Sequence, residues 1–157
     1  YGETKAMAEK AVLAVNPESC IIRTALMYGR GADGAPGSFL AWTIDALKKD
    51  EALRLYTNQF RAPLYAPDVA NFIDLLLTNA AAPGIYHAAG PHRLSRHEIG
   101  LQIAQAFNLS PARIIPTEVE RPAGHGPIDD CTLSTTKAET LGMHFTGFVE
   151  GLSLLHG

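Results

Sequence analysis

The 157-residue chain has only two cysteines, one tryptophan and no run of like charges. Cys20 and Cys131 lie far apart, so reduced thiols are the default expectation and one disulfide between them is the alternative. A net charge of −3 without a basic cluster gives no signature of binding to nucleic acid or to an anionic membrane. No apolar segment approaches the length of a membrane span, and the N-terminus does not resemble a signal peptide. We therefore expect a cytoplasmic protein with no nucleic-acid or membrane partner.

Motifs for metal and hydrolytic chemistry are also lacking. The six histidines form no HExxH pattern and no mixed Cys/His set, so no metal site is expected. The serines show no nucleophile-elbow pattern, which leaves a hydrolase without support. Residues 29–34 match G-x-G-x-x-G after an apolar strand, but Ala35-Pro36-Gly37 follow and delay the helix that a dinucleotide-binding loop requires. A loop beside a substrate pocket is the preferred interpretation of this segment.

Helical and strand patterns alternate along the chain, which predicts an α/β architecture. The strand at 19–24 is almost continuously apolar, as in a parallel sheet buried on both faces, so Cys20 and a paired Arg23 are expected to be buried. Phe39 and Trp42 are expected to lie in the core. A capping box at 95–98 and a glycine at 142 predict one helix start and one helix end. The expected helices are 2–15, 38–49, 68–77, 95–107, 134–142 and 145–155, and the expected strands are 19–24, 53–56, 61–66, 85–88 and 113–116.

Tyr1 and Lys5 begin the first expected helix and lie one turn apart on the same face. A free phenol has a pKa of about 10 and donates its proton slowly at neutral pH. A neighbouring ammonium lowers that pKa by about 1–3 units. Such a tyrosine could give a proton to a carbonyl oxygen or take one from a hydroxyl. Because the same spacing is common on protein surfaces, this interpretation depends on the segments that follow.

Those segments resemble the extended short-chain dehydrogenase/reductases, and most closely the sugar-nucleotide reductases of the dTDP-4-dehydrorhamnose reductase type. In that family a helix that begins with Tyr-x-x-x-Lys leads into a strand ending in Arg-Thr, followed by Tyr-Gly, which here are Arg23-Thr24 and Tyr28-Gly29. The resemblance extends over nearly the whole chain and rests on the order and spacing of its motifs. The further matching segments are 58–70, 85–90, 94–98, 121–122 and 134–138.

The resemblance implies the C-terminal part of a Rossmann-type protein, namely the last sheet strands plus a small α/β substrate-binding lobe. Residues 1–30 and 67–90 would belong to the Rossmann-type sheet layer, and residues 31–66 and 91–157 to the substrate-binding lobe. The chain starts at a tyrosine and inside a helix, so we expect it to be a fragment of a longer protein. The missing N-terminal Rossmann segment would carry the phosphate-binding loop for the dinucleotide, and a homodimer is a further expectation.

The resemblance also implies roles for individual residues. Tyr1 would act as the general acid, and Lys5 would lower its pKa and hold the ribose hydroxyls of NADP or NAD. Tyr1, Lys5 and Thr24 would contact the cofactor. A nucleotide-diphosphate sugar would be the substrate, and planar guanidinium groups suit its diphosphate. The residues expected to bind that substrate are Arg61, Arg121 and Lys137.

The expected function is therefore an NAD(P)H-dependent reductase of a nucleotide-diphosphate 4-keto sugar, with the fragment itself inactive. An NAD-dependent epimerase or dehydratase of a sugar nucleotide is an alternative, because these enzymes share the Tyr–Lys chemistry. A non-catalytic regulatory subunit with the same fold, such as that of methionine adenosyltransferase, is another. The last alternative is a complete small domain, which would have to cover its exposed sheet edges by association.

Overall fold

The computed structural model describes residues 1–30, 39–78, 83–120 and 129–155 and confirms the α/β architecture. The helices are α1 (Gly2–Val15), α2 (Phe39–Lys48), α3 (Ala66–Thr78), α4 (Arg96–Ala106), α5 (Thr136–Glu139) and α6 (Phe148–Ser153), with a 3-10 turn η1 (Pro111–Arg113). The strands are β1 (Cys20–Thr24), β2 (Met27–Tyr28), β3 (Leu53–Tyr56), β4 (Phe60–Arg61), β5 (Leu64–Tyr65), β6 (Gly84–Ala88), β7 (Leu94–Ser95) and β8 (Ile114–Thr117). No helix in these ranges is long and apolar enough to cross a membrane.

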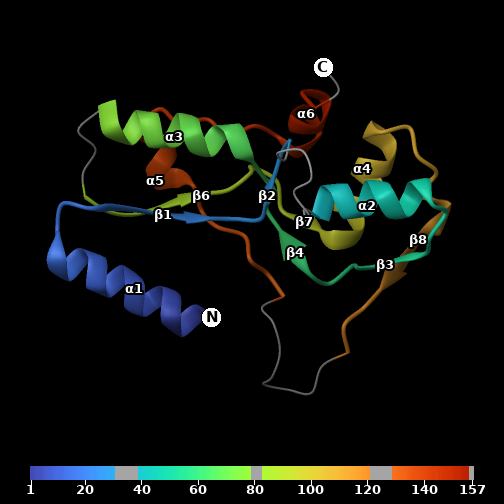
Figure 1. Cartoon of the computed structure of the whole chain (residues 1–157), viewed down its shortest axis with the longest axis horizontal. Helices are drawn as coiled ribbons and strands as arrows, with labels where there is room; N and C mark the ends of the chain where they lie inside the picture. Colours follow the sequence, from blue (N-terminus) through green and yellow to red (C-terminus); the bar gives the residue numbers. More distant parts are fainter. Residues whose placement is uncertain (31–38, 79–82, 121–128, 156–157) are drawn as a thin grey trace.

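The described strands form two-stranded pairs that divide the molecule into two parts (Figure 1). In one part, β1 and β6 run parallel, with α3 and α5 on one side and α1 on the other. In the other part, β3 and β8 run parallel beside α2 and α4, and β4 pairs antiparallel with β7. The parallel pair of β2 and β5 lies between the two parts.

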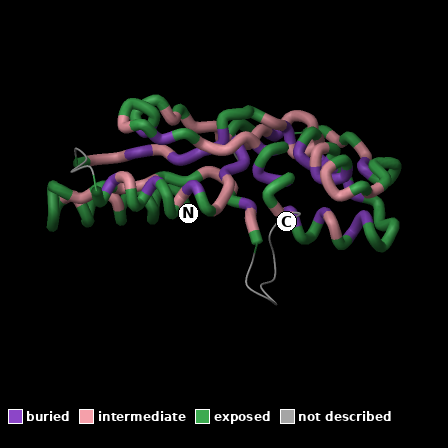
Figure 2. The backbone as a smooth tube through the Cα atoms, turned by 90° about the horizontal axis from the view of Figure 1, so that it is seen from above, coloured by how far each residue is buried: buried purple, intermediate pink, exposed green. Residues whose placement is uncertain are grey.

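Three apolar clusters hold these elements together, and Figure 2 shows buried positions interspersed with exposed ones along the backbone. One cluster joins α3 and β6 through Phe72 and Tyr86, whose rings pack edge to face at 5.9 Å. A second joins α4 and α6 around Tyr28, and a third places Leu53 and Leu55 of β3 against α2 and α4. Each cluster draws on segments that are distant in the sequence.

Local sequence signals place several helix ends where they were predicted. Ser95 Oγ accepts a hydrogen bond from the Glu98 backbone N–H at 3.1 Å, and the Glu98 carboxylate accepts one from the Ser95 N–H at 2.7 Å. These reciprocal bonds form the capping box that begins α4. Gly142 has a φ of +90°, in the left-handed region that glycine tolerates best, and ends the turn after α5.

Close contact between the Tyr28 side chain and the backbone of α6 explains the glycine at position 151. A Cβ atom at Gly151 would lie only 1.9 Å from the Tyr28 hydroxyl oxygen, so any side chain there would displace the tyrosine. Tyr28 in turn packs edge to face on Phe148, with ring centroids 4.8 Å apart. The glycine therefore lets α6 lie directly against the ring of Tyr28 in β2.

The prediction that the first strand is buried on both faces is wrong. Within the described ranges β1 pairs only with β6, and Cys20, Arg23 and Thr24 are exposed. Arg23 is paired, as predicted, but with Glu9 at the surface. The apolar composition of β1 correctly predicted a parallel strand. Burial of both faces of that strand also requires a layer of structure over each face. The two cysteines, both in described segments, form no disulfide.

Trp42 is also misplaced by the prediction, because it is 49% exposed instead of buried in the core. Its neighbour on the same helix, Phe39, is only partly buried and lies 5.7 Å from it, ring to ring. The side of α2 that packs inward carries Leu40, Thr43, Ala46 and Leu47. The predicted strand at 61–66 is resolved into two shorter strands, β4 and β5.

Candidate active site

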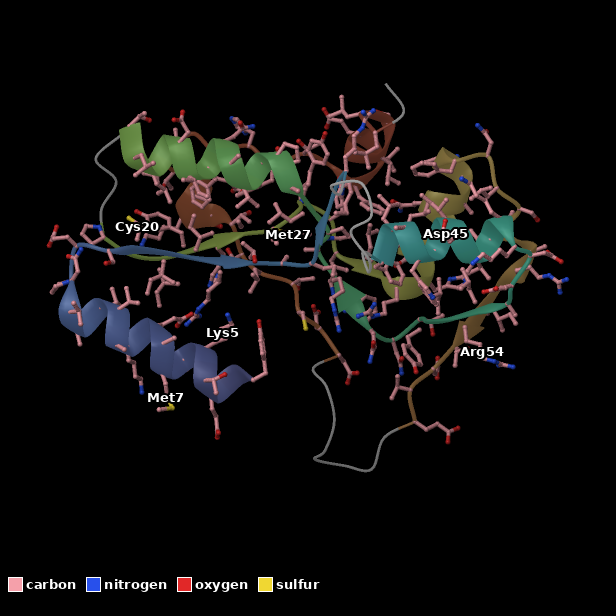
Figure 3. The ribbon with its side chains drawn as sticks, in the orientation of Figure 1. Lys5, Met7, Cys20, Met27, Asp45 and Arg54 are labelled. Carbon is pink, nitrogen blue, oxygen red and sulfur yellow. The ribbon has the colours of Figure 1, made fainter. Side chains whose placement is uncertain are left out.

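Tyr1 and Lys5 lie together at the exposed end of α1. The Lys5 ammonium nitrogen is 5.6 Å from the centroid of the Tyr1 ring, and the Lys5 backbone N–H donates to the Tyr1 carbonyl at 3.1 Å. Figure 3 shows Lys5 on the side of the helix that faces β1, whereas Met7 points away from the sheet. The Tyr1 side chain is accessible to a ligand, because the residue is 94% exposed. The expected pairing of phenol and amine is therefore present in the geometry.

An ion pair connects α1 to β1. The Arg23 guanidinium donates two hydrogen bonds to the Glu9 carboxylate, at 2.8 and 2.7 Å. The hydrogen bond from Arg23 lowers the pKa of Glu9, and the same contact raises the pKa of Arg23. Thr24, the predicted cofactor contact, follows Arg23 at the end of β1 and is exposed. Arg23 thus aligns the helix of the Tyr–Lys pair with the strand that ends at Thr24.

A second tyrosine, Tyr28, has the opposite environment. It is 5% exposed, and burial raises its pKa well above the ordinary value of 10, so its hydroxyl stays protonated. It lines a small apolar pocket between β2, α2, α4 and α6, together with Met27, Leu40, Ile99 and Phe148. The lining of this pocket includes neither Tyr1 nor Lys5. Of the two tyrosines, only Tyr1 presents its side chain to solvent.

Arg61, predicted to bind the substrate, lies on β4 and is joined by an arginine that the sequence analysis did not single out. One Arg61 N–H group donates to the Phe60 carbonyl at 2.6 Å. The antiparallel register places Phe60 opposite Ser95, so Arg96 at the start of α4 lies next to the same strand. Burial, and next the charge of Arg61, lower the pKa of Arg96. The sequence did contain a signal for the position of Arg96, because the capping box predicts that a helix starts at this residue.

A third arginine near this strand has a different arrangement. Arg93 donates to the Asp130 carboxylate at 2.8 Å, and its guanidinium carbon lies 3.3 Å from the centroid of the Phe60 ring. The hydrogen bond from Arg93, followed by those from Thr132, lowers the pKa of Asp130 to about 2. Asp130 is therefore ionised at neutral pH, and its carboxylate accepts hydrogen bonds from Arg93 and Thr132.

The other predicted substrate contacts are not brought to Arg61 by any contact that the structure shows. Lys137 lies against β6, where its ammonium donates to the Ile85 carbonyl at 3.1 Å and sits 3.7 Å from the centroid of the Tyr86 ring. Arg121 lies outside the described residues, as do residues 31–34 of the glycine-rich loop.

Comparisons with known proteins identify relatives of this arrangement. The chain matches the family described as "RmlD substrate binding domain" over residues 1–155. It is 31% identical over 144 residues to a dTDP-4-dehydrorhamnose reductase of Mycolicibacterium smegmatis, covering 91% of this chain and 43% of that protein. It is 27% identical over 150 residues to the methionine adenosyltransferase 2 subunit beta of Danio rerio, covering 91% of this chain and 46% of that protein. The chain thus spans less than half the length of these curated relatives.

Solved structures share the fold. A dTDP-4-dehydrorhamnose reductase from Clostridium acetobutylicum superposes with a TM-score of 0.86 at 23% identity, covering 99% of this chain and 54% of that one. The corresponding Bacillus anthracis enzyme, solved in complex with NADP, gives a TM-score of 0.84 at 21% identity, covering 99% of this chain and 53% of that one. A Thermus thermophilus UDP-glucose 4-epimerase in complex with NAD gives 0.71 at 22% identity, covering 93% of this chain and 49% of that one.

These findings confirm the resemblance to extended short-chain dehydrogenase/reductases and the Rossmann-type fold class. The proteins that the chain resembles include sugar-nucleotide reductases, and their structures include complexes with NADP and with NAD. The chain belongs to the RmlD substrate binding domain family.

Proposed function

We propose that this chain provides the acid–base pair and most of the substrate-binding lobe of an NAD(P)H-dependent reductase that acts on a nucleotide-diphosphate 4-keto sugar. The observation that carries the proposal is the exposed Tyr1 ring with the Lys5 ammonium 5.6 Å from its centroid, on a helix aligned with β1. Support also comes from the relatives that are named as reductases of this substrate class.

The residues at this end of α1 and β1 fit a nicotinamide dinucleotide. The Tyr1 hydroxyl, the Lys5 ammonium and the Thr24 hydroxyl belong to exposed residues, and all three groups can donate hydrogen bonds to ribose oxygens. The cofactor, when bound, would supply the hydride for the keto carbon. The Tyr1 hydroxyl gives its proton to the keto oxygen, which becomes the product hydroxyl. The positive charge of Lys5 stabilises the phenolate that remains on Tyr1.

The proposal assigns the remaining parts of the chain as follows. Residues 1–30 and 67–90 contribute to the Rossmann-type sheet layer, and residues 31–66 and 91–157 provide the substrate-binding lobe, except for α5, which packs against β6 of the sheet layer. The phosphate-binding loop for the cofactor belongs to a preceding segment of a longer polypeptide, so residues 1–157 alone have no turnover. Arg61 and Arg121 contact the substrate, with Arg61 directed at its diphosphate. Lys137 is left out of this assignment, because its ammonium is engaged by the Ile85 carbonyl and the Tyr86 ring near the start of β6.

The test is Tyr1→Phe in the full-length protein that contains this chain, assayed by NAD(P)H oxidation with a dTDP-4-keto sugar. Loss of the proton donor is expected to lower kcat by about 10²–10⁴-fold, the range typical of general acid–base catalysis. Met7→Ala is the matched control, because Met7 is exposed on the opposite side of the same helix. Activity of Tyr1→Phe within about twofold of the parent would refute the assignment of Tyr1 as the general acid.

A regulatory binding module is a second candidate, because several relatives at 27–30% identity are named methionine adenosyltransferase 2 subunit beta. The Tyr1→Phe variant separates the two functions. A regulatory role predicts that the parent protein shows no reductase turnover and that binding to a methionine adenosyltransferase catalytic subunit survives the substitution. A reductase role predicts that turnover is present in the parent and collapses in the variant.

A further inference from the structure

Arg61 on β4 and Arg96, which directly follows the paired strand β7, both lack a carboxylate partner among the described residues. The ion pairs in those segments join other arginines to acidic groups, namely Arg23 to Glu9, Arg93 to Asp130 and Arg113 to Asp50. Arg61 instead donates to backbone carbonyls, those of Phe60 at 2.6 Å and Asp129 at 3.5 Å. Two uncompensated guanidinium groups repel each other, so an anion placed between them would be bound favourably.

Arg96 is held in place by contacts that leave its charge unneutralised. Its backbone N–H donates to the Gln59 carbonyl at 3.0 Å, and its guanidinium carbon lies 5.4 Å from the centroid of the Phe39 ring. Arg96 is half-buried, and desolvation together with the charge of Arg61 lowers its pKa. A half-buried cation in this position binds an anion more strongly than a fully solvated one would, because less water screens the interaction.

Gln59 provides an independent observation that points to a ligand. The residue is only 5% exposed, yet in the described part of the chain no group forms a hydrogen bond with its carboxamide. Its backbone carbonyl is the one that accepts from Arg96, so the two residues are in direct contact. A buried amide without a partner is unfavourable, and a ligand with acceptor oxygens would satisfy its N–H groups.

We propose that Arg96 and Gln59 act together with Arg61 as the site for the diphosphate of a nucleotide-linked substrate. A diphosphate has only acceptor oxygens at neutral pH, and this cluster offers guanidinium and amide donors. The identity of the ligand rests on the proposed function, whereas the assignment of Arg96 and Gln59 rests on the geometry. Arg93 takes no part in binding, because Asp130 already neutralises it.

Inorganic pyrophosphate is a direct probe, titrated calorimetrically into the full-length protein at low ionic strength. Arg96→Met keeps the length of the apolar stem and is expected to weaken binding at least about tenfold, the effect of losing one charge-assisted donor group. Gln59→Met is expected to weaken binding by about fivefold. The same variant should not lower the melting temperature of the ligand-free protein, since it removes a buried amide that has no partner.

Arg54→Met is the matched control, because it removes the same charge from an exposed position of β3 and should leave the affinity unchanged (Figure 3). The inference is overturned if the parent protein does not bind pyrophosphate, if Arg96→Met binds within about twofold of the parent, or if Arg54→Met weakens binding equally. Should Arg96→Met not fold, Arg96→Lys retains the charge without the planar fork and must still weaken binding severalfold. Tyr1→Phe should leave the affinity for pyrophosphate unchanged. Pyrophosphate binding therefore tests the diphosphate site, and turnover tests the proposed reaction, independently of each other.

Discussion

Helices α1 and α4 carry the two candidate functional clusters, and they are stabilised in different ways. The 14 residues of α1 include no buried residue, whereas the 11 residues of α4 bury Ile99, Gly100, Ile103 and Ala104. Arg96, the member of the proposed diphosphate site that lies on α4, therefore belongs to a helix that is fixed in an apolar core. The Tyr–Lys pair lies on α1. This helix is stabilised by residues of high helix propensity and by the exposed ion pair between Glu9 and Arg23. The proposed proton transfer would thus take place on the less firmly packed of the two helices.

Truncation of one apolar residue in each helix should give the largest difference in the free energy of unfolding. Ile103→Ala removes a fully buried side chain from α4 and is expected to lower the free energy of unfolding by about 2–5 kcal/mol. Val12→Ala in α1 removes a side chain that is largely exposed and should change it by no more than about 0.5 kcal/mol. Urea denaturation of the two variants measures both values. An equal loss in both would mean that α1 is packed against a surface outside the described contacts.

A smaller loss is expected at the carboxylate that fixes the segment before α6. Asp68 is buried in α3, where its oxygens accept from the Thr146 backbone N–H at 2.7 Å and from the Thr146 hydroxyl at 3.0 Å. Asp68→Asn keeps the shape but replaces one acceptor with a donor, which should cost about 1–3 kcal/mol in the same denaturation experiment. Asp74→Asn, at an exposed position of the same helix, should be neutral. A neutral Asp68→Asn would show that Thr146 is held by other groups.

The smallest effect should be the pH dependence of α1. Because Arg23 lowers the pKa of Glu9 below its ordinary value of 4.5, the ion pair stabilises the helix above that pH. This contribution is lost as the pH falls through the lowered pKa, when Glu9 becomes protonated. Amide hydrogen exchange in α1, corrected for its intrinsic pH dependence, should therefore accelerate relative to α4 upon acidification.

Glu9→Gln should show the faster exchange already at neutral pH, and it should remove the pH dependence. Glu3→Gln is the control, because Glu3 is exposed in the first turn of the same helix. If α1 in the Glu9→Gln variant exchanges as slowly as in the parent, the contact with Arg23 does not hold the helix in place.

Local features of the fold were predictable because they depend on neighbouring residues. The Ser95–Glu98 capping box and the left-handed Gly142 were predicted from short patterns, and both are present. The exposure of Trp42 and Cys20 was not predictable in this way. A helical or strand pattern indicates which positions share a face, but the depth of burial depends on what covers that face.

The sequence by itself determined the order of the elements, the α/β class and the pairing of Tyr1 with Lys5 on one helical face, since one turn of helix suffices to bring them together. Only the tertiary structure decided that Arg96 follows the strand paired with β4, which carries Arg61, and that the Arg96 backbone N–H donates to the carbonyl of the buried Gln59. These contacts depend on the antiparallel pairing of β4 with β7, and that register is set by packing between segments far apart along the chain.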